Sequence, residues 1–159
     1  MRPLAPASDE RRFYLFDAPW KILMAWRGWI RRDQRRRLPR VAARLLAPYR
    51  VMYCVTEGGA ILHEGWLVIG RSPLYDVEAT DVVFGPISTR ANERGRGLAA
   101  FGLEQAIDSM VDRGYRTFYI HTRERNAASR RVIDKCGFGP PVERIVMGDL
   151  RQASPDLAS

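Results

Sequence analysis

The sequence is poor in the residues that build metal centres, disulfide frameworks and membrane spans. Its 159 residues include two cysteines and two histidines. Cys54 and Cys136 lie far apart without metal-ligand spacing, which argues against a disulfide framework or a cysteine zinc site and favours a reducing, cytoplasmic location. No stretch approaches the roughly 20 consecutive apolar residues of a transmembrane helix, and the N-terminus lacks the apolar run of a secretory signal. We therefore expect a cytoplasmic protein without a bound metal.

Lysine is scarce as well, and the charge is unevenly distributed. Lys21 and Lys135 are the only lysines among 26 basic residues, and the net charge is +8. Residues 1–50 hold 13 of the basic residues and four of the 18 acidic ones, so the rest of the chain is close to neutral. The positive charge therefore belongs to the N-terminal third. No recognition motif accompanies it, so we expect no specific nucleic-acid partner.

The length suits a single domain. Neither an internal repeat nor a low-complexity linker marks a boundary within the chain. We expect a flexible N-terminus over residues 1–10, one domain over residues 11–150 and a flexible tail over residues 151–159.

Apolar periodicity and turn residues predict strands and helices that alternate along the chain. Strands are expected over residues 13–16, 50–56, 61–69, 81–88, 117–122 and 142–147. Helices are expected over residues 18–37, 39–46, 97–113 and 127–136. Glu57-Gly58-Gly59 supplies the turn of an antiparallel hairpin. This order predicts an α/β fold with a mixed sheet flanked by helices.

The most informative stretch is the glycine-containing loop between an expected strand and an expected helix, Arg94-Gly95-Arg96-Gly97-Leu98-Ala99. Glycine allows a ligand to approach the backbone closely, and a helix start presents unpaired N–H groups at a positive dipole end. Together they suit a pyrophosphate. The plain alternative is a loop that merely enters a helix. No Gly-Lys-Ser/Thr follows, which excludes a P-loop.

A second motif lies one helix and one strand further along. It consists of Asn126-Ala127-Ala128-Ser129, where the helix expected over residues 127–136 begins, and Gly137-Phe138, where that helix ends. The two motifs in this order resemble the GNAT N-acetyltransferase superfamily, in which the first element reads Gln/Arg-x-x-Gly-x-Gly/Ala. The resemblance is strong from about residue 81 to residue 138. Gly85-Pro86 and the Asn-x-x-Ser spacing resemble a subgroup found near polysaccharide-assembly genes.

The resemblance implies the GNAT fold, a sheet that is mostly antiparallel, and acetyl-coenzyme A as cosubstrate. It assigns the pyrophosphate to the backbone amides of residues 94–99 and the pantetheine arm to backbone groups of Ile87 and Thr89. An N–H there would also stabilise the oxyanion of the tetrahedral intermediate. The Asn126 side chain would hydrogen-bond the pantetheine, and Arg130 or Arg131 would reach the coenzyme phosphates.

Direct acetyl transfer needs a base for the attacking amine. His121 is the first candidate, since it lies five residues before Asn126, where some protein N-terminal acetyltransferases of the superfamily look similar. The alternative is a strand histidine that points to the opposite face. Asp81 is the second candidate, with a solvated strand-edge aspartate as its alternative. His63 and Glu64 are expected to be an exposed pair on the hairpin rather than part of the acceptor cleft.

Protonation of the departing thiolate has no obvious donor. Many family members carry a tyrosine at the position of Ile133, and isoleucine donates no proton. Members of the Asn-x-x-Ser type often lack this tyrosine too. Ser129, Tyr119 or water are the candidates to replace it.

Tryptophans at positions 20, 26 and 29 precede an arginine run over residues 31–37. In GNAT folds the first two helices flank the acceptor groove, so a basic rim would favour anionic acceptors such as nucleotide-linked amino sugars. The helix 18–37 is also a candidate for peripheral membrane contact, with an ordinary solvated helix as the alternative. Family members are often dimers, so a homodimer is a candidate assembly.

We therefore interpret the chain as an N-acetyltransferase for a small amine, with an amino sugar as the preferred acceptor. A protein N-terminal or lysine acetyltransferase is the alternative enzyme. A module that binds acetyl-coenzyme A without turnover is the alternative from another class, and Ile133 is its only support.

Overall fold

The computed structural model describes residues 11–28, 30 and 32–142. The two predicted flexible ends, residues 1–10 and 151–159, lie outside the described residues, as do Trp29 and, beyond Val142, the predicted strand 142–147. The elements are β1 (Arg12–Phe16), α1 (Pro19–Gly28), the 3-10 helix η1 (Arg32–Arg37), α2 (Leu38–Arg44), β2 (Arg50–Glu57), β3 (Ala60–Ile69), β4 (Val82–Thr89), the 3-10 helix η2 (Ala91–Glu93), α3 (Leu98–Val111), β5 (Phe118–Ile120) and α4 (Ala127–Lys135).

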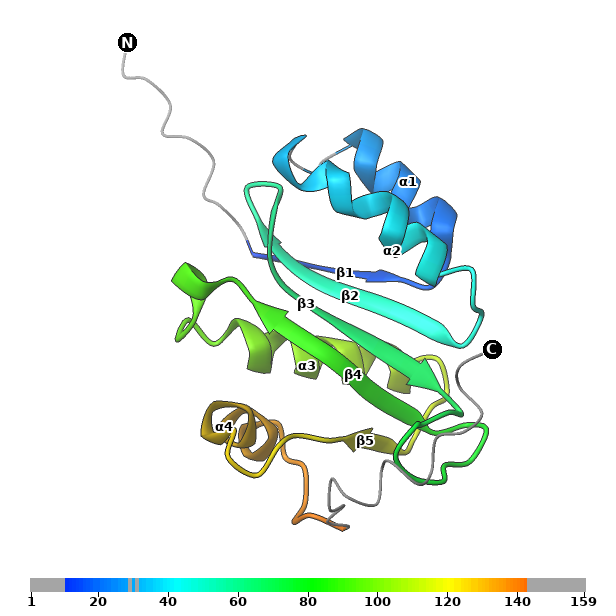
Figure 1. Ribbon diagram of the computed structural model, residues 1–159, viewed down its shortest axis with the longest axis vertical. Coiled ribbons are helices and arrows are strands. Elements are labelled where there is room, and N and C mark those ends of the chain that lie inside the picture. Colours follow the sequence, from blue (N-terminus) through cyan, green and yellow to red (C-terminus); the bar gives the residue numbers. More distant parts are fainter. Residues whose placement is uncertain (1–10, 29, 31, 143–159) are drawn as a thin grey trace.

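The strands form one sheet in the order β1-β2-β3-β4-β5 (Figure 1). The first three pairings are antiparallel, and β4 pairs with β5 in parallel. Gly58 and Gly59 have φ values of 55° and 73° at the turn between β2 and β3, which is the left-handed backbone that a tight hairpin requires. The expected mixed, mostly antiparallel sheet is confirmed.

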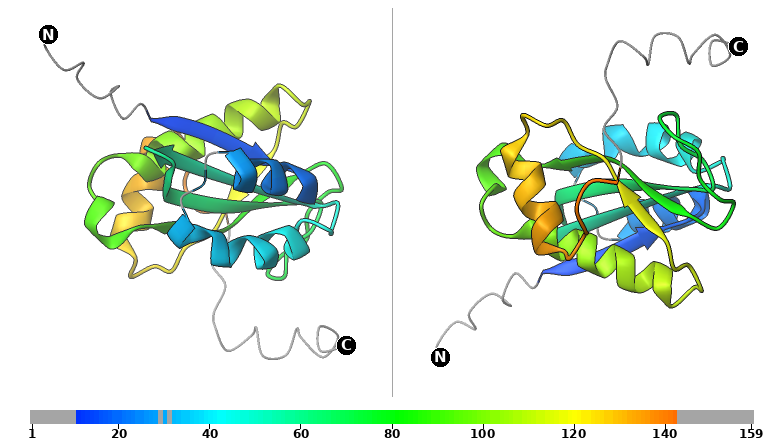
Figure 2. Two further views of the ribbon diagram at one scale, coloured as in Figure 1. Left: turned by 90° about the horizontal axis from the view of Figure 1, so that it is seen from above. Right: turned by 90° about the horizontal axis from the view of Figure 1, so that it is seen from below.

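Helices cover both faces of the sheet (Figures 1 and 2). On one face, Ile22 of α1 and Leu38 of α2 pack with Met52 and Trp66 in a core cluster. On the other face, α3 contributes Leu103, Ala106 and Met110 to a cluster with Tyr53, Leu67 and Phe84. Alternate residues of β2 thus enter different cores, as the two-residue period of a strand dictates. No described helix has the length and apolar character needed to cross a membrane.

The predicted single helix over residues 18–37 is wrong. The chain forms α1 up to Gly28 and then a separate 3-10 helix from Arg32. The Ile30 N–H donates to the Ala25 carbonyl at 3.2 Å, the six-residue bond that closes a helix C-terminus. Glycine at the end of α1 adds a weak helix former at the same place.

Candidate functional site

The end of β4 has an edge to which β5 contributes no partner. The parallel pairing joins only Val82–Phe84 to Phe118–Ile120, whereas β4 continues to Thr89 (Figure 1). On its other side, β4 stays paired with β3 up to Thr89, which faces His63. Ile87 and Thr89, the two residues expected to offer backbone groups to a pantetheine arm, both lie in this half-paired stretch.

The glycine loop leads directly into α3. Gly95 and Gly97 have φ values of 80° and 73°, and Gly97 is the residue that caps the start of the helix. The Phe101 N–H bonds to the Gly97 carbonyl, so the N–H groups at the start of α3 precede the first helical hydrogen bond. A Cβ at either glycine would meet no atom within 4 Å. The backbone here is open to a ligand, as an anion site at a helix start requires.

Arg96 ties this loop to the β2–β3 hairpin. Its guanidinium donates to Glu57 Oε2 at 2.6 Å and also pairs with Glu93. The hydrogen bond from Arg96 lowers the pKa of Glu57, and a second one from Arg11 at 3.4 Å acts in the same direction. The Arg96 guanidinium is therefore engaged by two carboxylates and fixes the loop against the hairpin. Leu98 points away from the loop into the core.

The second motif starts α4. The Asn126 side chain accepts a hydrogen bond from the Ser129 N–H at 3.1 Å, which is an N-cap. Its oxygen is thus used within the helix, and its NH₂ group is the part that suits a ligand. Arg130 is exposed, and its Nη1 donates to the Glu124 carbonyl at 3.5 Å. The N-cap therefore gives Asn126 a structural role of its own, and it makes no use of the Ser129 hydroxyl.

His121 lies directly after β5, which ends at Ile120 and is shorter than predicted. The residue is exposed, and its ring meets the ring of Tyr75 edge-on at 6.4 Å. Tyr75 also contacts Tyr119 at 5.7 Å. Partial desolvation lowers the pKa of His121 from its ordinary value. A neutral imidazole at pH 7 suits a general base.

Asp81 is buried, so the prediction of a solvated strand-edge aspartate is wrong. Its Oδ2 accepts a hydrogen bond from the Glu78 N–H at 2.9 Å, in the turn that precedes β4. The Asp81 N–H donates to the Glu78 carbonyl at 3.0 Å. This carboxylate is engaged in holding the turn, which weakens its candidacy as a base.

Residues 18–138 match the GNAT acetyltransferase family. The chain belongs to this family. Its activity is therefore acetyl-coenzyme A-dependent N-acetylation, with an amine as acceptor. The open β4 edge and the exposed start of α3 suit acetyl-coenzyme A as the cosubstrate. No curated protein matches the sequence.

Three solved structures are similar to the fold of this GNAT enzyme. An aminoglycoside N-acetyltransferase, AAC(6′)-Iy, in complex with coenzyme A has a TM-score of 0.65 and 19% identity, with 90% of this chain and 96% of that chain covered. A predicted acetyltransferase with acetyl-coenzyme A from Clostridium acetobutylicum has a TM-score of 0.58 and 17% identity, with 89% and 98% covered. The aminoglycoside 6′-N-acetyltransferase AAC(6′)-Ih from Acinetobacter baumannii has a TM-score of 0.58 and 14% identity, with 86% and 95% covered.

In this GNAT enzyme, His63 and Glu64 are not the exposed hairpin pair that the sequence predicts. His63 is 1% exposed and faces α3, and its Nδ1 lies 2.8 Å from Thr89 Oγ1. Glu64 points to the opposite face, where it pairs with Arg37. The error arises because β3 is covered on both sides, so its polar residues are enclosed on whichever face they occupy. Sequence reasoning missed the Thr89 hydroxyl as the partner of His63.

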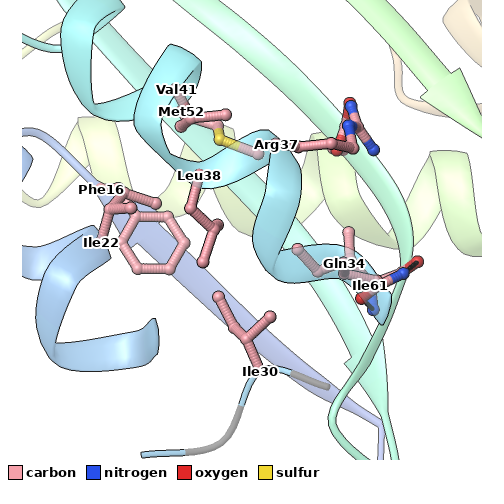
Figure 3. A pocket seen from close by; sticks show the side chains of 10 residues that line it. Phe16, Ile22, Ile30, Gln34, Arg37, Leu38, Val41, Met52 and Ile61 are labelled. Carbon is pink, nitrogen blue, oxygen red and sulfur yellow. Dashed lines mark hydrogen bonds and ion pairs between the residues drawn. The ribbon is translucent and has the colours of Figure 1, made fainter. Parts of the chain in front are cut away.

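Glu64 and Arg37 border a cavity between the sheet and the first helices (Figure 3). Apart from Gln34, the other side chains that line the cavity are apolar, among them Phe16, Ile30 and Met52. It measures about 10 Å³, close to the space that one water molecule needs. As the described residues are arranged here, this space is too small for an amino sugar. The described residues also contain no group of three histidine, cysteine, aspartate or glutamate side chains able to hold a metal ion.

Proposed function

We propose that this enzyme acetylates the amino group of a small anionic amine, with a nucleotide-linked amino sugar as the preferred acceptor. The half-paired end of β4 beside the open start of α3 is the observation that carries the coenzyme part of the proposal. The acceptor part depends on the charge of the helices on the opposite face of the sheet.

The coenzyme is held mainly by backbone groups. The amides of residues 94–99 bind the pyrophosphate, where Gly97 has a positive φ and no side chain in the way. Ile87 and Thr89 offer backbone groups along the β4 edge to the pantetheine arm. The Asn126 amide nitrogen and the Arg130 guanidinium supply the side-chain contacts. Asn126 is well placed for this because its cap fixes the orientation of the side chain.

In the reaction, the amine nitrogen attacks the thioester carbonyl, the C–S bond breaks and coenzyme A leaves as a thiol. His121 takes the proton from the amine, and its lowered pKa keeps the imidazole neutral at pH 7. A backbone N–H at the end of β4 stabilises the oxyanion. Ser129, in the first turn of α4, takes the place of the missing tyrosine, because Ile133 carries no proton to give. Its hydroxyl passes a proton to the thiolate and regains one from solvent, so the serine ends the cycle protonated.

The acceptor class follows from electrostatics. Exposed arginines crowd the helices of the first face and the 3-10 helix between them, at positions 27, 32, 36, 37, 40 and 44. Aminoglycosides, the substrates in the names of two structural neighbours, carry several positive charges, and a surface of the same sign repels them. A nucleotide-linked amino sugar has an amine on a sugar and negative phosphates. The resemblance to the Asn-x-x-Ser subgroup near polysaccharide-assembly genes favours the same class.

The proposal is tested by thiol release from acetyl-coenzyme A with three acceptor pools. They contain nucleotide-linked amino sugars, aminoglycosides, and peptides with free N-termini or lysines. We expect release with the first pool, with a rate that falls as salt rises. Release with only the second pool would overturn the electrostatic argument, and release with only the peptides would support the protein acetyltransferase. Coenzyme binding without release from any pool would favour a module without turnover.

A second proposal concerns the outer side of α1, as a site of peripheral contact with an anionic membrane. Trp20, Leu23 and Met24 are 60%, 47% and 65% exposed, and with the exposed Arg27 they occupy positions i, i+3, i+4 and i+7 of the helix. An apolar stripe edged by arginine is the pattern of a helix that lies in a lipid interface.

Co-sedimentation with anionic vesicles tests this contact, with neutral vesicles as the control. We expect binding only to the anionic vesicles and its loss in the double variant Leu23→Ser, Met24→Ser. Equal binding by the variant would contradict the proposal. A mass that rises with concentration and falls in the variant would assign the stripe to a homodimer instead.

A further inference from the structure

A buried polar cluster lies between the sheet and α3, beneath the end of β4. His63 of β3 and Tyr53 of β2 are both fully enclosed, and their ring centroids lie 5.7 Å apart. His63 Nδ1 contacts Thr89 Oγ1 at 2.8 Å. His63 Nε2 and the Tyr53 hydroxyl have no hydrogen-bond partner in the part of the chain that the structure describes. Within the described residues, the Thr89 hydroxyl is therefore the hydrogen-bond partner of the His63 imidazole.

Two glycines make room for this cluster. A Cβ at Gly102 of α3 would lie 2.7 Å from His63 Cδ2 and 3.0 Å from Nε2. A Cβ at Gly65 would lie 2.4 Å from the Tyr53 ring. Real Cβ atoms do not approach so closely, so any larger residue would displace the rings. The helix and the strand are thus both shaped around a histidine that sequence reasoning set aside.

The contact between His63 and Thr89 lies where β4 is paired with β3 but no longer with β5. Thr89 is the last residue of β4, five residues beyond the final pairing with β5. It is held by its register with His63 and by the next bond, from the Arg90 N–H to the Leu62 carbonyl at 3.0 Å. The same residue offers its backbone to the coenzyme in the function proposed above. The Thr89 side chain is held by His63 beneath the sheet, and this contact therefore helps to orient the Thr89 backbone at the open edge of β4.

We propose that His63 is a positioning residue that, through Thr89 Oγ1, holds the end of β4 in the conformation that binds acetyl-coenzyme A. This inference rests on the proposed coenzyme site. His63 does not act as the base, because it is enclosed beneath α3 on the far side of Thr89 from the β4 edge. Burial lowers its pKa to about 4, so the imidazole stays neutral and the bond to Thr89 persists at neutral pH.

The test compares two matched pairs of variants. Thr89→Val removes the hydroxyl at constant shape, while Thr89→Ser keeps it. His63→Leu removes the ring nitrogen, while His63→Asn keeps a polar atom near the position of Nδ1. A neutral hydrogen bond of this kind corresponds to about a three- to tenfold change in an equilibrium constant. We expect Thr89→Val and His63→Leu to weaken acetyl-coenzyme A binding by about that factor, and Thr89→Ser and His63→Asn to restore most of it.

Three further readouts separate positioning from a general loss of packing. Because the end of β4 also supplies the oxyanion N–H in the proposed function, Thr89→Val should both raise the KM for acetyl-coenzyme A and lower kcat, and Thr89→Ser should recover both. In the His63→Leu background, Thr89→Val should have no further effect on binding, because the two residues act as a unit. Amide exchange of residues 87–90 should accelerate in Thr89→Val and not in Thr89→Ser. Equal binding by Thr89→Val and Thr89→Ser, or additive effects of the two substitutions, would overturn the inference.

The amide exchange is measured on the protein without coenzyme, which keeps this inference separate from the proposed function. If the unmodified protein fails to bind acetyl-coenzyme A, the proposed function fails. The part of the inference that concerns β4 is then still decided by exchange, where unchanged rates in Thr89→Val would refute it and faster rates would support it.

Discussion

The buried imidazole of His63 predicts a specific loss of stability in mild acid. Burial lowers its pKa to about 4 in the folded protein, while an unfolded chain restores the ordinary value of about 6.5. Between these two values the unfolded state binds the proton and the folded state does not, so the free energy of unfolding falls as the pH falls. The contribution of the neutral His63 imidazole to the free energy of unfolding is complete above about pH 6.5 and is lost progressively down to about pH 4. Between about pH 7 and about pH 5, protonation of this one imidazole in the unfolded state should lower the free energy of unfolding by about 2 kcal/mol.

Urea unfolding at a series of pH values measures this loss directly, and the variant His63→Asn provides the reference. Carboxylates titrate mostly below this range, so the difference between the two curves isolates the histidine. His121 also has a lowered pKa, but it is present in both proteins and cancels in the comparison. We expect the starting protein to lose stability more steeply than the variant. Parallel curves over the whole range would show that the imidazole is hydrated or already charged, and would refute the reasoning.

Three further predictions concern the coenzyme and catalytic groups. Gly97→Val should abolish coenzyme binding in calorimetry. The control is Gly114→Val, which has a φ of 95° and equally open surroundings, so it should cost similar backbone strain and still bind the coenzyme normally. Normal coenzyme binding by Gly97→Val would contradict the loop assignment. Asn126→Ala should lose its N-cap and about 1 kcal/mol of stability, while Asn126→Asp should keep the cap and lose coenzyme affinity. If Asn126→Asp binds the coenzyme as tightly as the unmodified protein, the role of Asn126 is purely structural. His121→Ala should lower turnover and remove the acidic limb of the pH–rate profile, which lies below about pH 6.5, and an unchanged profile would move the base role to Asp81 or water.

The sequence predicted the backbone of the glycine loop and of the β2–β3 turn well, because the signals for both are local. Gly95 and Gly97 adopt the positive φ that glycine alone accepts without strain, and α3 begins at the next residue. Gly58 and Gly59 form the expected turn between β2 and β3 for the same reason. The family match over residues 18–138 confirms the resemblance that the two motifs suggested. A positive φ depends on the identity of a single residue, so it can be predicted without knowledge of the tertiary fold.

The sequence failed where the answer depends on what packs against an element. The break after Gly28 was missed because the apolar and basic pattern continues through it, and the closing bond from Ile30 to Ala25 is visible only in three dimensions. Asp81 was expected in solvent, yet a turn folds over it. Polar residues on a two-sided sheet look exposed in the sequence, since their partners lie on distant strands and helices.

The buried histidine explains why the end of β4 can be both open and well ordered. A strand edge that receives a ligand lacks a neighbouring strand there, so half of its usual hydrogen bonds are missing until the ligand binds. Thr89 compensates from the opposite side, with a hydroxyl directed at His63 rather than at the edge. The space for that imidazole comes from Gly102, only five residues after the glycine that starts α3. In the proposed function, α3 therefore contributes to coenzyme binding twice: its exposed N-terminus binds the pyrophosphate, and its second turn leaves room for the His63 ring beneath β4.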